Sequence, residues 1–200
     1  NIFYNKMEGV KMYNNVEYDW GKIESLLPEK LPRCRDRPAV FGIDDEVLKR
    51  RNSDRGGNLL DENGNKIGKR MISYGNLAES LCLGITKEFF VKKDKFRESQ
   101  YNKKYPELWQ ECKNMIHKID SDFKYDCVMI NHNAQCQKHI DSRNVGESII
   151  VGLGDYNNGN LQVEDWMYHI RHRPIKFNGS KLYHSTRDFT GDRWSMIFFR

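Results

Sequence analysis

The spacing of apolar residues changes near the middle of the chain. Residues 106–120, with the sequence PELWQECKNMIHKID, repeat apolar side chains at helical intervals. The segment opens with Pro106, which suits the first helical position, and carries Glu107 in its first turn. The apolar face consists of Leu108, Cys112, Met115, Ile116 and Ile119. The pattern predicts an amphipathic helix over this segment.

Beyond this helix the pattern changes to short apolar or alternating runs, which are separated by clusters of glycine, asparagine and aspartate. The runs are YDCVMIN (125–131), SIIVGLG (148–154), NLQVED (160–165), PIKF (174–177), KLYH (181–184) and RWSMIFF (193–199). Short strands at such spacing are typical of a β-barrel or a β-sandwich. The last third of the chain is therefore predicted to be rich in strands.

The first hundred residues show weaker patterns. Residues 1–20 are polar with scattered aromatic side chains and are predicted to form an arm. The segment 21–30 has apolar residues at helical spacing and is stopped by Pro28, which predicts a short helix. Residues 38–43 indicate a short strand, and Asn63-Gly64 lies between two short runs, which predicts a hairpin.

No internal repeat, low-complexity tract or linker divides the chain. Its length of 200 residues suits one domain with one buried core. We therefore predict a single domain over 1–200, in which the arm and support elements of 1–104 pack on the helix and β-rich core of 105–200.

Composition limits the class of protein. Only 38% of the residues are hydrophobic, but ten Phe, ten Tyr and four Trp supply large apolar side chains, which favours a globular chain over a disordered one. No run approaches the roughly 18 apolar residues of a membrane span, and the first residues lack the order of a signal peptide. We expect a soluble, intracellular protein, in the nucleus or the cytoplasm. Five cysteines without a Cys-x-x-Cys pair favour reduced thiols over a disulfide framework.

The net charge of +5 is unevenly distributed. Residues 1–125 carry 24 Lys and Arg against 20 Asp and Glu, whereas 126–200 carry 9 against 8. The excess forms four basic clusters, at 33–37, 49–55, 66–70 and 92–97. Such clusters can neutralise phosphates, which makes DNA a candidate partner. Solvated faces balanced by nearby acids explain them equally well.

The candidate chemistry begins at His139-Ile140-Asp141. Residues two apart on an extended chain face the same side, so His139 and Asp141 can offer a nitrogen and an oxygen to one metal ion. The triplet alone decides nothing, because roughly 0.45 His-x-Asp triplets are expected by chance in this composition. His184 is the candidate third ligand. Two histidines and one carboxylate form the facial triad of non-haem iron(II) oxygenases, which leaves positions open for a co-substrate and oxygen.

Two further residues fit the same plan. Arg193 follows His184 by nine residues, and its planar fork can grip the carboxylate of a 2-oxo acid bidentately. Ser195 faces the same way two residues later and can donate another hydrogen bond. A zinc site from Cys136 and His139, with Cys127 or His184, is the alternative on ligand type. That alternative leaves Asp141 and Arg193 without a role.

This order of residues resembles the 2-oxoglutarate and Fe(II)-dependent dioxygenases. The segments YPELWQECKNMI, INHNAQCQKHIDSRNVGESIIVGLGDYNNGNLQVED and PIKFNGSKLYHSTRDFTGDRWSMIFF are similar to the TET/JBP-like branch, which oxidises the methyl group of 5-methylcytosine or thymine in DNA. The resemblance covers about residues 105–200. It implies an α+β fold with a double-stranded β-helix core, of the jelly-roll or cupin-like kind, and an N-terminal helical support.

The resemblance also implies the cofactors and their ligands. His139, Asp141 and His184 would bind Fe(II), and Arg193 with Ser195 would hold the distal carboxylate of 2-oxoglutarate. Oxygen would be consumed, and succinate and CO2 would be released with the hydroxylated product. The implied substrate is a pyrimidine base in DNA, flipped out of the stack. The alternative is a protein side-chain hydroxylase, for example of proline, for which the same residues serve.

Four more polar residues are candidates near this site. Asn131 and Asn133 alternate on the strand before the motif, and we assign Asn131 to the co-substrate and Asn133 to the substrate. Arg143 and Asp155 are also assigned to the substrate, although a surface ion pair explains Arg143 and turn chemistry explains Asp155 equally well. The segment NAQCQK departs from the branch, because some DNA-oxidising members carry an arginine shortly before the His-x-Asp motif that helps to bind the co-substrate.

Overall fold

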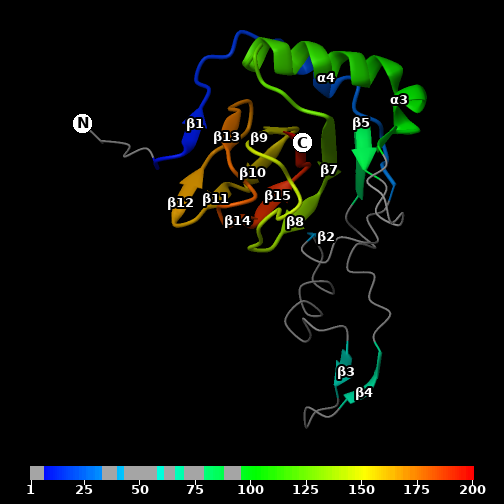
Figure 1. Ribbon diagram of the computed structural model, residues 1–200, viewed down its shortest axis with the longest axis vertical. Coiled ribbons are helices and arrows are strands. Elements are labelled where there is room, and N and C mark those ends of the chain that lie inside the picture. The colour runs from blue at the N-terminus through cyan, green and yellow to red at the C-terminus, as the bar shows by residue number, and fades with distance from the viewer. Residues whose placement is uncertain (1–6, 33–39, 43–57, 61–65, 70–78, 88–95) are drawn as a thin grey trace.

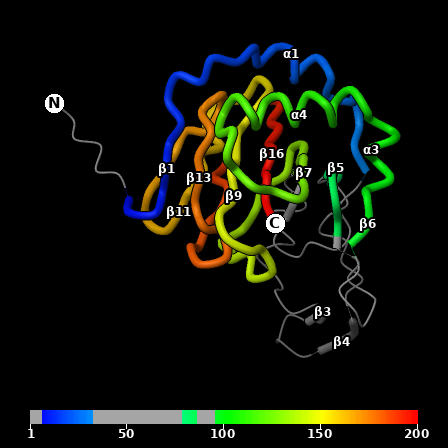
Figure 2. Tube along the Cα trace, turned by 45° about the horizontal axis from the view of Figure 1, so that its top comes forward, coloured from blue at the N-terminus to red at the C-terminus, as the bar shows by residue number. Residues whose placement is uncertain are grey.

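The computed structural model describes residues 7–32, 40–42, 58–60, 66–69, 79–87 and 96–200. Its largest element is a seven-stranded antiparallel sheet with the order β1-β13-β9-β16-β7-β5-β6 (Figure 1, and Figure 2, where all seven strands are labelled). The strands are β1 (Val10–Met12), β13 (Ile175–Phe177), β9 (Ser148–Leu153), β16 (Trp194–Phe199), β7 (Cys127–His132), β5 (Glu79–Lys87) and β6 (Phe96–Glu98). We call it the major sheet.

A smaller layer lies against the inner face of the major sheet. Strand β11 (Leu161–Val163) pairs with β12 (Trp166–Tyr168) on one side and with β14 (His184–Thr186) on the other. The segment after β8 (Ala134–Cys136) meets β14 through a single bridge between His139 and His184. Strands β10 (Tyr156–Asn158) and β15 (Phe189–Gly191) form a separate pair. We call β8, β14, β11 and β12 the minor sheet.

The chain alternates between these two layers. Strands β7, β9, β13 and β16 lie in the major sheet, and β8, β11 with β12, and β14 lie in the minor sheet between them in sequence. Alternation of successive antiparallel strands between two facing sheets is the topology of a double-stranded β-helix, or jelly roll. The predicted core fold is therefore confirmed, and the molecule is mostly β with few helices.

The outer face of the major sheet is covered by helices. Helix α4 (Pro106–Ile119) buries all five residues of its predicted apolar face in one core with β7, β9 and β16. Helix α1 (Trp20–Glu24) joins the same core through Ile23, and Figure 2 shows both helices crossing these strands. Helix α3 (Tyr101–Lys104) precedes α4. The helix predicted over 106–120 is confirmed, and the helical layer leaves the other face of the sheet for the barrel interior.

Several predictions for the first hundred residues are met in part. The short helix starts at Trp20 and ends at Glu24, earlier than predicted. Strand β2 (Val40–Gly42) pairs with β8, and β3 (Asn58–Leu60) pairs with β4 (Lys66–Lys69) on either side of Asn63-Gly64. The turn itself lies outside the described residues, as do the basic clusters at 33–37 and 49–55 and most of the one at 92–97.

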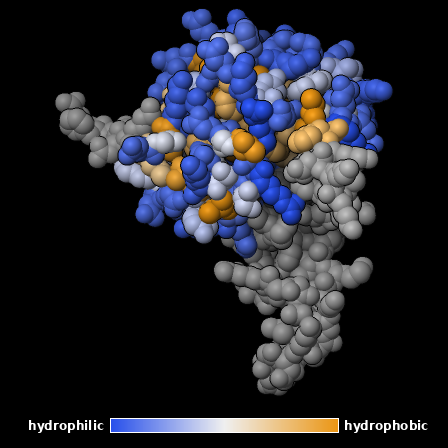
Figure 3. Space-filling view, in the orientation of Figure 1, coloured by the Kyte–Doolittle hydropathy of each residue, from blue (hydrophilic) through white to orange (hydrophobic). Residues whose placement is uncertain are grey.

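The surface agrees with a compact β core. On the face shown in Figure 3 the coloured residues are mostly hydrophilic, and hydrophobic ones occur in small separate groups. Within the described residues, no helix is long and apolar enough to cross a membrane.

Candidate metal centre and co-substrate site

The three predicted metal ligands lie on two neighbouring segments, the stretch that follows β8 and the first residue of β14. The backbone N–H of His139 donates to the carbonyl oxygen of His184, and the N–H of His184 donates back, both at 3.0 Å. The N–H of Asp141 donates to the carbonyl oxygen of Gly179 at 2.9 Å. Backbone pairing alone thus brings residues 139, 141 and 184 to one place.

The side chains converge at the distances that one metal ion needs. His139 Nε2 lies 3.4 Å from Asp141 Oδ1, and His184 Nε2 lies 3.4 Å from Asp141 Oδ2. One ligand atom from each of the three residues lies within 4.8 Å of the others. Donors about 2.1 Å from an ion and at right angles to one another are about 3 Å apart, so small side-chain movements suffice to close the site. The three donors fit a single divalent ion.

Both histidines present the correct nitrogen. His139 Nδ1 donates to the carbonyl oxygen of Gln137 at 2.6 Å, and His184 Nδ1 donates to that of Leu182 at 3.0 Å. A carbonyl oxygen only accepts, so Nδ1 carries the proton in both rings and the Nε2 lone pair is free for a metal.

The composition of the group argues against the alternative site that would use Cys136. Within the described part of the chain, the three residues are the one group of His, Cys, Asp and Glu that could hold a metal ion. Cys136 lines the same cavity but does not belong to the group. Two nitrogens and one oxygen, without a thiolate, are the donor set of non-haem iron(II) sites.

A cavity of about 740 Å³ opens beside the three ligands. Arg143 and Asn144 line it near the ligands, and Asn131 and Ser195 line it within the barrel. Apolar side chains make up much of the remaining wall, namely Met129, Ile150, Leu161, Phe177, Ile197 and Phe199. The predicted co-substrate residues Asn131 and Ser195 and the predicted substrate residue Arg143 therefore share one cavity with the metal ligands.

Arg193 lies deep in the same barrel, although it does not line this cavity. Its side chain is 2% exposed, and Nε donates to the carbonyl oxygen of Gly159 at 3.2 Å. The guanidinium carbon lies 5.3 Å from the ring centroids of both Tyr156 and Phe189. A Cβ atom on Gly159 would lie 2.9 Å from Arg193 Nε, so glycine is needed for this approach. The guanidinium therefore packs against the rings of both Tyr156 and Phe189.

Part of this buried guanidinium lacks a partner. Arg193 Nη2 and the hydroxyl of Tyr156 are both buried; the two side chains interact with each other, but neither atom makes a hydrogen bond of normal geometry to a described residue. Native proteins leave few buried polar atoms unsatisfied, and such atoms mark ligand sites. A carboxylate from the co-substrate would satisfy both, and this observation is our test that 2-oxoglutarate fits the residues present.

The row of side chains behind Arg193 supports the same assignment. In the major sheet Ser195 pairs with Asn131 on one side and with Gly152 on the other. Asn131 Nδ2 lies 3.4 Å from Ser195 Oγ, and both residues are buried. A Cβ atom on Gly152 would lie 2.2 Å from the Tyr156 hydroxyl, so this glycine makes room for the tyrosine. Glycine inside a strand is the signal in the sequence that a side chain approaches there.

Two predicted substrate residues lie elsewhere. Asn133 has a φ of 46°, and its side-chain oxygen accepts from the backbone N–H of Arg193 at 2.8 Å. It does not line the cavity, because the chain turns at this residue between β7 and β8. Asp155 lies outside the barrel in an ion pair with Arg171 at 3.2 Å, and its side chain is exposed. The placement of Asn133 and Asp155 does not support direct contact with a substrate.

Comparisons of sequence find no relatives. No family model matches the chain, and no curated protein matches it in sequence.

Solved structures resemble the chain at low identity. NgTET1 in complex with 5mC DNA matches with 14% identity and a TM-score of 0.48, over 60% of this chain and 60% of NgTET1. A prolyl hydroxylase from Trichoplax adhaerens, in complex with a peptide fragment of the hypoxia inducible factor oxygen degradation domain, matches with 11% identity and a TM-score of 0.47, over 96% of this chain and 83% of that one. A 2OG-Fe(II) oxygenase family oxidoreductase from Burkholderia pseudomallei matches with 13% identity and a TM-score of 0.41, over 61% and 66%. The chain thus spans about three fifths of the length of NgTET1.

Proposed function

We propose that the chain is an Fe(II)- and 2-oxoglutarate-dependent dioxygenase. The observation that carries the proposal is the pairing of two features in one barrel. Near its mouth, two Nε2 lone pairs and a carboxylate converge as a facial triad. Deeper inside, a buried guanidinium retains an unsatisfied nitrogen. A dicarboxylate that chelates a metal at one end and meets an arginine at the other needs both features.

The protein's own residues hold and orient the reacting groups. When bound, iron would supply the activation of O2, with oxidative decarboxylation of 2-oxoglutarate to succinate and CO2 and hydroxylation of a substrate carbon. His139 and His184 would bind the ion through Nε2, and Asp141 would offset part of its charge. The hydrogen bonds to Gln137 and Leu182 fix both rings before the ion arrives.

The far carboxylate of the co-substrate has its own set of donors. Arg193 would grip it with its fork, Ser195 and Tyr156 would add hydroxyl groups, and Asn131 would steady Ser195. Stacking between Tyr156 and Phe189 restricts the guanidinium, so little conformational freedom is lost on binding.

For the substrate, we favour the methyl group of a pyrimidine base in DNA, either 5-methylcytosine or thymine. The cavity wall is largely apolar, and it contains one buried hydroxyl without a partner among the described residues, that of Ser148. Such a wall suits a flat ring with a methyl group and one polar edge. Lys138 and Arg143 stand on either side of the His-x-Asp motif, and Lys181 lies two residues after Gly179, which pairs with Asp141. Arg143 lines the cavity itself, and cations close to the motif suit the phosphates that flank a flipped base.

A protein side-chain hydroxylase is the second candidate. The same apolar wall suits an aliphatic side chain such as proline, and the triad and the arginine would serve equally well. Structures similar to the chain include both a DNA complex and a prolyl hydroxylase, so the choice rests on this chain's own residues.

Anaerobic reconstitution with Fe(II) and 2-oxoglutarate tests the enzyme class. We expect the weak visible band of the metal chelate in the wild-type protein and its loss in His139→Ala. Mass spectrometry of nucleosides after exposure to oxygen then tests the substrate, and we expect 5-hydroxymethyl products coupled to succinate. Absence of the band in a folded wild-type protein would refute the dioxygenase, whereas a band with products only on peptides would select the second candidate.

A further inference from the structure

The first residue of strand β9 carries a buried hydroxyl that the fold leaves unused. Ser148 begins this strand and is 1% exposed. Its Oγ has no hydrogen-bond partner among the residues that the structure describes. A buried hydroxyl without a partner costs free energy, so native proteins rarely keep one that serves no purpose. Ser148 is therefore a candidate contact for a ligand.

Alternation along β9 places Ser148 on the side of the barrel interior. Ile149 and Val151 belong to the core that the strand shares with the helices. Successive residues of a strand face opposite sides, so Ser148 and Ile150 face the barrel, and both line the cavity that holds the metal ligands. Rotation about the Cα–Cβ bond moves Oγ among three staggered positions. The hydroxyl can therefore turn toward a group bound in the cavity.

Ser148 lies near the metal ligands rather than near the buried arginine. It pairs with Phe177 of β13, whose ring packs edge-on against His184 with centroids 5.1 Å apart. On the same face of β9, Gly152 makes room for Tyr156. Gly152 follows Ser148 by four positions, which corresponds to roughly 13 Å along a strand. A co-substrate carboxylate bound at the Gly152 end is therefore out of reach of this hydroxyl.

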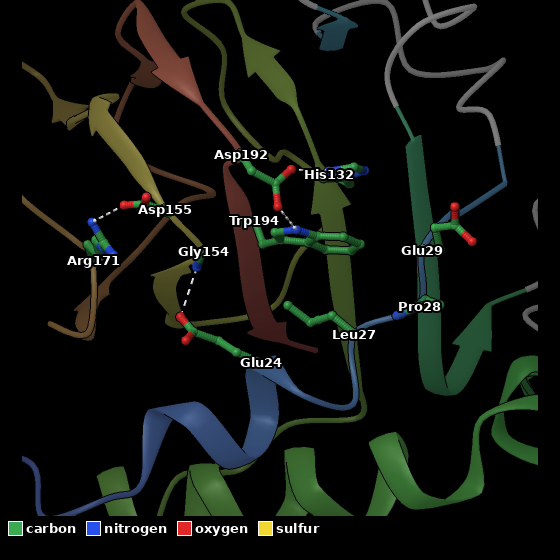
Figure 4. A pocket seen from close by; sticks show the side chains of 10 residues that line it. All are labelled: Glu24, Leu27, Pro28, Glu29, His132, Gly154, Asp155, Arg171, Asp192 and Trp194. Carbon is green, nitrogen blue, oxygen red and sulfur yellow. Dashed lines mark hydrogen bonds and ion pairs between the residues drawn. The ribbon is translucent and has the colours of Figure 1, made fainter.

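A second cavity, of about 430 Å³, offers a comparison (Figure 4). Its polar groups are already paired within the fold. Glu24 accepts from the backbone N–H of Gly154 at 2.9 Å, and Asp192 accepts from Trp194 Nε1 at 3.0 Å, as the dashed lines in Figure 4 show. Within the described residues, none of the buried atoms without a partner belongs to its lining. Of these two cavities, the one with the metal ligands has the unsatisfied hydroxyl, that of Ser148.

We propose that Ser148 is a specificity-determining residue, which binds the polar substituent next to the reacting methyl group of the base. This inference rests on the proposed function. The ring carbon next to the methylated one carries an amino group in 5-methylcytosine and a carbonyl oxygen in thymine. A serine hydroxyl both donates and accepts, so it binds either substituent. The metal side of the cavity thus selects a methyl group that has a polar atom beside it.

The same hydroxyl disfavours a purely aliphatic side chain. Such a group would fill the apolar part of the cavity but leave Ser148 Oγ unpaired and shut off from water. A site that is built to hydrogen-bond its substrate rejects an analogue without the polar atom, because its own buried group is then left unsatisfied. The hydroxyl therefore favours a methylated base over the side chain of proline.

Short single-stranded oligonucleotides test this contact by binding rather than by turnover. The protein is loaded with Mn(II) and 2-oxoglutarate without oxygen, and affinity is measured by fluorescence anisotropy. Each strand carries one test base in a run of unmethylated cytosines. The test base is thymine, its difluorotoluene isostere, 5-methylcytosine, or the analogue of 5-methylcytosine in which hydrogen replaces the amino group. In at least one of the two pairs, the wild-type protein should bind the natural base about 10-fold more tightly, because the analogue loses the hydrogen bond.

Ser148→Ala removes the hydroxyl and leaves the rest of the cavity wall. The variant should bind each natural base and its analogue equally, with the affinity that the wild type has for the analogue. Because the hydroxyl has no partner in the described fold, the melting temperature should not fall. The dissociation constant for 2-oxoglutarate, measured by calorimetry, should not change either. A lower melting temperature would assign the hydroxyl to the fold, and weaker 2-oxoglutarate binding would assign it to the co-substrate; each result would overturn the proposal.

The matched control is Ser142→Ala. Ser142 also lines the cavity, but it is exposed, so water satisfies its hydroxyl and the variant should keep the wild-type preference. A wild-type protein that binds no 2-oxoglutarate overturns the proposed function. If the wild type binds 2-oxoglutarate, the absence of any preference for the natural bases overturns the role of Ser148 alone, as does a preference that Ser148→Ala retains or Ser142→Ala loses. Tighter binding of a proline-containing peptide than of any oligonucleotide would select the second candidate and overturn it as well.

Discussion

Replacement of the buried arginine tests the co-substrate site most directly. In Arg193→Met the side chain stays unbranched and keeps most of its volume, but it becomes shorter and loses its charge and all its donors. We expect the variant to fold with nearly wild-type stability and to lose almost all the stabilisation that 2-oxoglutarate confers. The reason is that the guanidinium adds little to the net stability of the fold, whereas it supplies most of the affinity for the far carboxylate of 2-oxoglutarate.

The near-neutral effect on folding follows from opposing contributions. The change removes one charged hydrogen bond to Gly159, about 1.5–3 kcal/mol, and two ring contacts of about 0.5–2 kcal/mol each. Against these stands the desolvation of a charge that is only 2% exposed and forms no ion pair within the described residues, which costs several kcal/mol. We expect a change in the free energy of unfolding within about 2 kcal/mol.

The effect on ligand stabilisation is much larger. At a concentration about 100 times its dissociation constant, a ligand stabilises the folded state by about 2.7 kcal/mol. In a protein of this size that raises the melting temperature by about 5–10 °C. Loss of the charged pair raises the dissociation constant about 100-fold, so the same concentration now adds only about 0.4 kcal/mol, or about 1 °C.

The assay is thermal denaturation of Mn(II)-loaded protein with and without 2-oxoglutarate, in the absence of oxygen. Arg171→Met is the matched control, because Arg171 also lies over the Tyr156 ring, at 5.9 Å, but from outside the barrel and in an ion pair with Asp155. It should keep the full shift. A wild-type shift in Arg193→Met would refute the assignment, as would equal loss in both variants.

Three more predictions follow from other contacts. Gly152→Ala should lower the free energy of unfolding by about 1–3 kcal/mol through overpacking, because its new methyl group meets the Tyr156 hydroxyl. Tyr156→Phe should relieve part of that loss in the double variant. Additive losses of stability in urea unfolding would contradict the contact. Burial would raise the pKa of Asp120, but the Tyr13 hydroxyl and Lys176 lower it, so Asp120→Asn should cost about 1–2 kcal/mol at pH 7. That difference in stability should decrease as the pH falls from about 4 through the lowered pKa of Asp120 in the folded protein. The stabilisation is present above the unfolded pKa and is lost as the native carboxylate is protonated. An equal difference at pH 3 and pH 7 would exclude an ionic origin. Lys138→Ala and Lys181→Ala should each reduce the salt dependence of DNA binding by about 0.9 in the log–log slope, measured by fluorescence anisotropy, and unchanged slopes would remove these lysines from the DNA path.

The sequence predicted the parts of the fold that depend on local pattern. The helix over 106–120 and the strands at 125–131, 148–154 and 193–199 appear within a few residues of their predicted ends. The strand predicted over 181–184 begins only at His184, because the backbone N–H groups of Lys181 and Leu182 donate to the carbonyl oxygen of Asn178 and form a turn there. Local hydrogen bonds of this kind leave little trace in a hydrophobic pattern.

The candidate site could be predicted from the sequence wherever side chains alternate regularly between the two faces of an extended chain. Asn131 and Ser195 meet because β7 and β16 are regular and pair in register, and His139 and Asp141 share one side because the chain beyond β8 stays extended over 139–141 and pairs with His184 and Gly179. The expectation for Asn133 was not supported, because a residue with positive φ ends the alternation one position beyond His132. The contacts of His132 with Glu79, Asp192 and Trp194 could not be foreseen, since these four residues come from three distant segments that only the sheet register brings together.

The candidate metal site depends on the register of two chain segments, because a single bridge joins His139 to His184. The two residues are 45 positions apart, and their rings meet only when these two short segments pair in one register. A slip of one residue would turn one imidazole to the opposite face of the sheet and replace it with Lys138 or Ile140, or with Tyr183 or Ser185. On the proposed function, an ion that needs both rings would bind only chains with this register and would select them from the folding ensemble. Closure of the barrel at this seam and acquisition of the metal then become one cooperative event.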